Sequence, residues 1–114
     1  MSAIQAILAS SEDGMSQTPT KIVLTRARGM IADESRWLQG DWSDTSEGYI
    51  KRCAYQAVED AATALGLDCE RPLAHLVGPI GEDGDCPRDT IPEFNDEAEH
   101  GDVMALFDLA LETA

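Results

Sequence analysis

The chain has 114 residues, of which 43% are hydrophobic and 26% charged, so its length and composition suit one globular domain and disfavour wholesale disorder. Its charge is unusual, because 22 Asp and Glu residues against 8 Lys and Arg residues give a net charge of −14. Residues 1–40 are balanced, so the whole excess lies in residues 41–114. This negative field repels phosphate groups, which disfavours direct binding to nucleic acid or to an anionic membrane and favours a basic protein as partner.

The N-terminal residues and the cysteines predict where the protein resides. Residues 1–17 combine a short apolar turn with Ser, Glu, Asp and Gly, which predicts a flexible N-terminal arm ahead of a single helical domain over residues 18–114. Cys53, Cys69 and Cys86 show no paired spacing, and we find no signal segment. No apolar run approaches the roughly 20 residues of a membrane span. We therefore expect a cytoplasmic protein with reduced thiols and no membrane association.

Hydrophobic spacing predicts an all-α fold, a compact bundle of three to four helices. Thr18 and Pro19 suit the cap and the first position of a helix over about residues 19–35. The linker after it contains Trp37 and Trp42, whose indole rings favour burial. We expect this linker to fold back onto the core.

A second predicted helix has the clearest apolar stripe of the chain. Ser46 suits its cap, and the stripe runs from Ile50 to Leu65 and stops at Gly66. Many of its apolar residues are alanines, whose small side chains let neighbouring helices approach closely. We therefore expect this helix to pack closely against its neighbours.

The last third of the chain is predicted to be a long acidic loop followed by a final helix. Residues 71–77 suit one or two helical turns, which Gly78 and Pro79 are expected to end. Residues 78–101 are rich in Gly, Pro and carboxylates, so we expect them to form the loop. The final helix is predicted from an apolar stripe at helical spacing: Val103, Leu106, Phe107, Ala110 and Leu111.

Several motifs follow one another in an order typical of one family. They are Thr18-Pro19 opening a helix, Trp37-Leu38-Gln39-Gly40, a cysteine-bearing alanine-rich helix, and Ile91-Pro92-Glu93-Phe94-Asn95-Asp96 ahead of an apolar helix. In this order the chain resembles domain-of-unknown-function family 6197, an uncharacterised family of bacteria and phages, over about residues 18–112. The matching positions are Trp37, Cys53, Phe94, Asn95 and Asp96. The resemblance implies a shared fold and no particular activity.

The Asn95-Asp96 pair has two interpretations. An amide beside a carboxylate can bind a ligand, and together with Trp37, Gln39 and Phe94 the pair would frame a pocket. The same pair is favoured where a loop turns into a helix, because short polar side chains bond to nearby backbone amides. Both interpretations stay open at the level of sequence.

No metal or cofactor is expected from the remaining motifs. Cys69, His75, Cys86 and His100 carry the donor atoms of a zinc site, but their separations differ from the short pairs of compact sites. Cys53 is expected to be a small buried residue without a nucleophile signature around it. We find no phosphate-binding glycine loop and no complete calcium loop.

Two functions are compatible with these patterns. The first is a small acidic, non-enzymatic interaction protein that docks onto a basic protein surface. In a sharper form its carboxylates mimic nucleic-acid phosphates and inhibit a nucleic-acid-binding protein, as an inhibitor from a phage or mobile element would. The residues expected to contact this partner are Glu82, Asp83, Asp85, Asp89, Glu93, Glu97 and Glu99.

The second function is a small ligand-binding or enzymatic domain. Its predicted pocket is framed by Trp37, Gln39, Phe94, Asn95 and Asp96. A third reading is that the acidity only keeps the protein soluble. The sequence leaves open whether the protein is a monomer or a homodimer.

Overall fold

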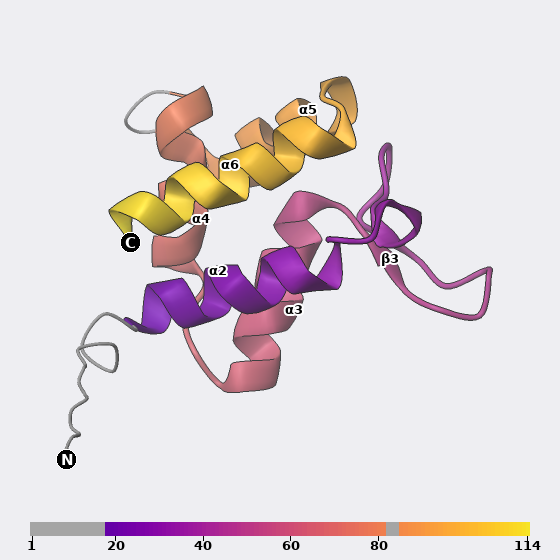
Figure 1. Cartoon of the computed structure of the whole chain (residues 1–114), viewed down its shortest axis with the longest axis horizontal. Coiled ribbons are helices and arrows are strands. Elements are labelled where there is room, and N and C mark those ends of the chain that lie inside the picture. The colour runs from indigo at the N-terminus through magenta and orange to yellow at the C-terminus, as the bar shows by residue number, and fades with distance from the viewer. Residues whose placement is uncertain (1–17, 82–84) are drawn as a thin grey trace, which may run out of the picture.

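The computed structural model describes residues 18–81 and 85–114, and these residues form a mainly helical fold (Figure 1). The predicted helical class is confirmed, and residues 18–81 and 85–114 contain five α-helices in place of the expected three to four. The predicted arm of residues 1–17, together with Glu82 and Asp83, lies outside the described residues. The elements are α2 (Pro19–Met30), η1 (Glu34–Arg36), β2 (Ser43–Asp44), β3 (Lys51–Arg52), α3 (Ala54–Leu65), α4 (Glu70–Ile80), α5 (Pro87–Glu97) and α6 (His100–Thr113).

Helix α2 begins where the sequence predicts and ends earlier. Thr18 is its N-cap, and the Thr18 hydroxyl accepts a hydrogen bond from a backbone N–H of the first turn at 3.1 Å. The helix ends at Met30 and not near residue 35. The separate 3-10 turn η1 follows, because Asp33 accepts a backbone hydrogen bond at 3.0 Å and so caps a new turn.

Helix α3 begins later than the sequence predicts. Ser46 does not cap it, because Ser46 lies between β2 and β3, which pair antiparallel in a short hairpin. The helix starts at Ala54 behind its N-cap Cys53. Ile50 therefore lies in the hairpin, with 40% of its surface exposed, and not in the core. Gly66 ends the helix as predicted, with a φ of 68° that suits glycine.

The predicted acidic loop is largely helical, and this prediction was wrong. Helix α4 continues through Gly78 and Pro79 to Ile80, and helix α5 occupies the centre of the expected loop. Pro at the first position suits the start of α5, but Pro92 lies in its interior, where proline normally disfavours a helix. Burial of Ile91 and Asn95 on one side of α5 compensates, because tertiary packing supplies most of a helix's stability in proteins.

One hydrophobic core is shared by the five helices of the described segments. Helix α2 packs against α3 and α6, and α4 and α5 lie behind α6 in the view of Figure 1. Small buried residues of α2, α3 and α6 let these helices approach one another closely, as the alanine-rich sequence predicts. The fully buried alanines are Ala27, Ala54, Ala57, Ala61 and Ala110, and Phe107 of α6 is the largest fully buried side chain.

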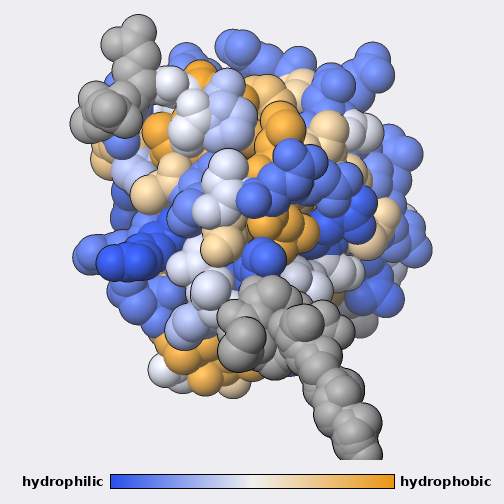
Figure 2. All heavy atoms as spheres, turned by 60° about the vertical axis from the view of Figure 1, so that its left-hand side comes forward, coloured by the Kyte–Doolittle hydropathy of each residue, from blue (hydrophilic) through white to orange (hydrophobic). Residues whose placement is uncertain are grey.

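The surface is mostly hydrophilic on the face shown in Figure 2, where hydrophobic residues appear as several separate patches. The exposed large hydrophobic residues of the described segments are Ile22, Ile50 and Leu109. Within these segments, no helix combines the length and the apolar character needed to cross a bilayer.

Candidate functional site

Asn95 lies fully buried where the segment after η1 meets the start of α3 and the end of α5. Its side-chain oxygen accepts hydrogen bonds from Trp37 Nε1 at 2.7 Å and from the Ala54 backbone N–H at 3.0 Å. Its side-chain nitrogen donates to the Leu38 carbonyl at 2.8 Å and, more weakly, to Asp96 Oδ1 at 3.4 Å. An Asn amide offers two donors and two acceptor positions, so contacts within the protein occupy all of them.

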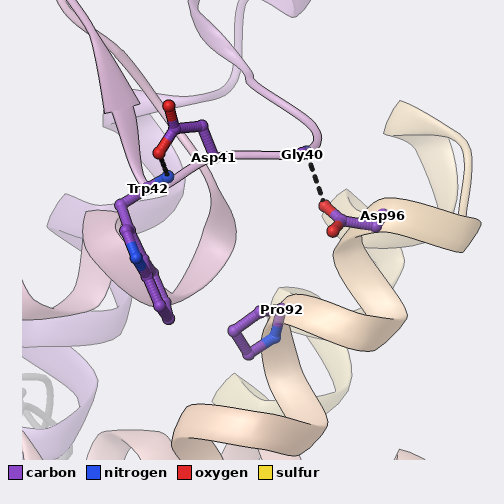
Figure 3. Close-up of a pocket in the computed structure, with 5 residues that line it drawn as sticks. All are labelled: Gly40, Asp41, Trp42, Pro92 and Asp96. Atoms are coloured by element: carbon purple, nitrogen blue, oxygen red, sulfur yellow. Dashed lines mark hydrogen bonds between the residues drawn. The ribbon is translucent and has the colours of Figure 1, made fainter.

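Gln39 and Asp96 extend this network between the same two segments. Gln39 Nε2 lies 3.1, 3.2 and 2.8 Å from the carbonyl oxygens of Asn95, Asp96 and Ala98. These carbonyls end α5 and lack partners within the helix, so Gln39 serves as a cap for them. Asp96 accepts a hydrogen bond from the Gly40 backbone N–H at 2.8 Å (Figure 3). We call Trp37, Gln39, Asn95 and Asp96 the Asn95 cluster.

The structure brings the Asn95 cluster together but divides the predicted pocket among separate surfaces. Trp37 and Gln39 line an open depression of about 430 Å³ beside η1 and the start of α6. Asp96 lines a second depression of about 200 Å³, where Trp42 and Pro92 face each other (Figure 3).

Phe94 lies on a third surface, a groove of about 250 Å³ formed by α4, α5 and α6. The reason for this separation is the helicity of α5, because successive side chains of a helix point about 100° apart. Phe94, Asn95 and Asp96 therefore face the groove, the core and the second depression. The sequence interpretation placed them side by side because it assigned them to a loop.

The exposed side of α5 carries three of the predicted partner-contacting residues. Asp89, Glu93 and Glu97 follow one another at intervals of four residues, so they form one stripe, which we call the acidic face of α5. All three are exposed, and among residues 18–81 and 85–114 no Lys or Arg lies within ion-pair distance of them. Arg88 lies on α5 too, but its guanidinium is placed over the Trp42 ring at 5.4 Å.

The other predicted acidic contacts are placed differently. Asp85 is exposed just before α5, and Glu99 is the N-cap of α6, where its backbone N–H donates to Asp102 at 3.2 Å. Glu82 and Asp83 lie in the part of the chain that is not described.

The cysteine and histidine side chains are dispersed. His100 donates from Nε2 to the Ile31 carbonyl at 2.7 Å, while His75 Nδ1 lies 2.8 Å from the Thr113 hydroxyl. Across the described segments, no three His, Cys, Asp or Glu side chains form a group suited to hold a metal ion. Cys53 is 2% exposed, and burial raises the pKa of its thiol. A nucleophilic cysteine needs the reverse, an accessible group with a lowered pKa.

The different exposure of Cys53 and Cys86 predicts the order in which their thiols are labelled. Iodoacetamide is expected to alkylate the exposed Cys86 in the native protein and to reach Cys53 only after unfolding. Peptide mapping by mass spectrometry, with and without urea, measures both rates. Equal labelling of Cys53 and Cys86 in the native protein would contradict the buried, protonated state of Cys53.

Sequence reasoning named Phe94 and Leu106 but missed the groove that they line together with Leu109. Leu109 falls outside the predicted apolar stripe of α6, which already meets the core through Leu106 and Phe107. A leucine outside its helix's own stripe is the signal that points to a second apolar surface.

Comparison with known proteins places the chain in a family. No curated protein and no solved structure matches it. A family model matches residues 15–113, a range that includes every helix described above and the Asn95 cluster. The match agrees with the resemblance based on Trp37, Cys53 and the Phe94-Asn95-Asp96 segment. The chain therefore belongs to DUF6197, a family of unknown function.

Proposed function

We propose that the protein is a small acidic interaction protein that docks onto a basic protein surface through the acidic face of α5. The observation that carries this proposal is the position of Asp89, Glu93 and Glu97 on the outer side of a helix. Ile91 and Asn95 fix the opposite side of this helix in the core. Consecutive carboxylates are thus roughly 6 Å apart along the helix axis and are held in place before binding.

The electrostatics of the chain support the same partner class. The net charge of −14 attracts Lys- and Arg-rich surfaces, and the one nearby cation of α5, Arg88, faces Trp42 and not the acidic face. Contacts between exposed charges are screened by salt, so binding should weaken as ionic strength rises. Nucleic-acid mimicry is a narrower form of this proposal, in which the carboxylates occupy phosphate positions on a nucleic-acid-binding protein.

The ligand-binding alternative has weaker support. Hydrogen bonds within the protein occupy the whole amide of Asn95, and the Gln39 amide caps the end of α5. Polar groups engaged in this way position neighbouring segments and are not free to orient a ligand. The Asn95 cluster therefore supports a structural role.

A pull-down from native lysate tests the proposal. The tagged wild-type protein is compared with the Asp89→Lys/Glu93→Lys/Glu97→Lys variant at about 50 and about 300 mM salt, a range over which exposed charges become screened. We expect the wild type to retain a basic protein at the lower salt and release it at the higher, and the variant to retain none. Added duplex DNA that displaces the retained protein would support the mimicry form.

The matched control carries the same charge change on other elements. Glu34→Lys/Glu70→Lys/Glu112→Lys replaces three exposed carboxylates, two of them in the first turns of η1 and α4 and one in the last turn of α6. We expect this variant to retain the partner. Equal loss in both variants would assign binding to net charge and not to α5. A wild type that retains no basic protein at either salt would contradict the proposal.

A further inference from the structure

An apolar groove runs between α4, α5 and α6, beside the acidic face. It has a volume of about 250 Å³, below the roughly 300–1,000 Å³ of small-molecule pockets, so it suits a single side chain of a partner better than a metabolite. Its lining includes Leu109, which is 48% exposed and so leaves apolar surface in contact with water. The lining residues are Pro79, Ile80, Phe94, Asp102, Ala105, Leu106 and Leu109.

The groove and the acidic face share an edge on α5. Phe94 lines the groove, while Glu93 precedes it and Glu97 lies one turn further along. On the opposite side Asp102 lines the groove from the first turn of α6. The apolar floor therefore lies between carboxylates on both sides, and its lining contains no Lys or Arg.

We propose that this groove receives an apolar anchor residue from a basic amphipathic helix of the partner. This inference rests on the proposed function and names the partner's secondary structure and its contact pattern. Charge complementarity selects the occupant, because Lys and Arg beside the anchor would pair with Glu93, Glu97 and Asp102. A second copy of the chain would instead bring the same carboxylates against one another.

Fluorescence anisotropy with two synthetic peptides tests the inference on the intact protein. The first probe is a labelled, amidated helical peptide with Leu at positions i, i+3, i+4 and i+7 and Lys elsewhere, and the second replaces each Leu by Ala. We expect Leu109→Ser to weaken binding of the Leu peptide by about tenfold, the scale of one buried apolar side chain, and to leave the Ala peptide unchanged. Ala105→Gln, which fills the groove without removing Leu109, should have the same effect.

The control substitution is Ile50→Ser, which removes a similarly exposed apolar side chain from the hairpin and should leave both peptides unaffected. The Asp89→Lys/Glu93→Lys/Glu97→Lys variant, here called the α5 reversal, is measured with the same peptides. If Leu109→Ser leaves Leu-peptide binding intact while the α5 reversal abolishes it, the groove inference is overturned and the proposed function stands. If the α5 reversal has no effect on either peptide, the proposed function fails. A concentration-dependent dimer in sedimentation velocity that Leu109→Ser removes would assign the groove to a second copy and overturn the inference.

Discussion

Replacing Asn95 by alanine is expected to lower the free energy of unfolding by about 3–5 kcal/mol, which places it among the most damaging single substitutions. The substitution leaves the Trp37 indole N–H, the Ala54 N–H and the Leu38 carbonyl without their partner. The Ala54 N–H is buried and the other two groups are partly buried, so each unsatisfied group costs about 1–3 kcal/mol, and a cavity forms as well. Urea unfolding followed by circular dichroism measures the change.

Asp96→Ala is the matched control for this prediction. Asp96 is the next residue of α5, but it is exposed and accepts a hydrogen bond from the Gly40 N–H at the surface. We expect Asp96→Ala to cost at most about 1 kcal/mol. An Asn95→Ala protein as stable as the Asp96→Ala protein would contradict the structural role of Asn95 and favour the ligand-binding alternative.

Phe107→Ala is expected to cost a similar amount, about 3–5 kcal/mol, for a different reason. Among the described residues, Phe107 is the largest fully buried side chain, and it lies in the core that helices α2 to α6 share. Its removal loses the transfer free energy of the ring and leaves a cavity that the surrounding helices fill only in part. For a domain of this size, we expect a fall in melting temperature of roughly 12 °C or more.

Leu109→Ala provides the comparison on the same helix. Leu109 is 48% exposed, so we expect its truncation to change stability by less than about 0.5 kcal/mol. Similar losses for Phe107→Ala and Leu109→Ala in thermal unfolding would mean that α6 does not pack through the face described here.

Local signals explain which helices could be predicted from sequence. Thr18 and Pro19 form a cap that depends on neighbouring residues alone, and Gly66 ends α3 through its own backbone conformation. The apolar stripe of α6 likewise repeats within one helix. The start of α3 could not be predicted from local signals alone. The spacing of Ile50 fits a helix, but backbone pairing between β2 and β3 holds this residue in a hairpin.

Helix α5 could not be predicted in the same way, because its stability comes from distant contacts. Two prolines and several carboxylates favour a loop locally, whereas burial of Ile91 and Asn95 favours a helix. The sequence did bring Trp37, Gln39, Asn95 and Asp96 into one group through the family motif. It could not show that these residues bond to one another and to the backbone across more than 50 intervening positions.

The two sides of α5 thus have different proposed roles. Its inner side connects α5 to the start of α3 and to the segment after η1 through Asn95. Its outer side carries Asp89, Glu93 and Glu97 and borders the apolar groove at Phe94. A rigid inner side keeps the outer carboxylates in a fixed arrangement, which lowers the entropy lost on binding.

The salt dependence of the dissociation constant for the retained basic protein tests the docking proposal most directly. We predict that the affinity of the wild type falls at least about tenfold between about 50 and about 300 mM salt, because salt screens the attraction between its exposed carboxylates and the basic partner. The Asp89→Lys/Glu93→Lys/Glu97→Lys variant should bind weakly at both concentrations. An affinity that is equal at both salt concentrations and unchanged by the three reversals would contradict docking through the acidic face of α5.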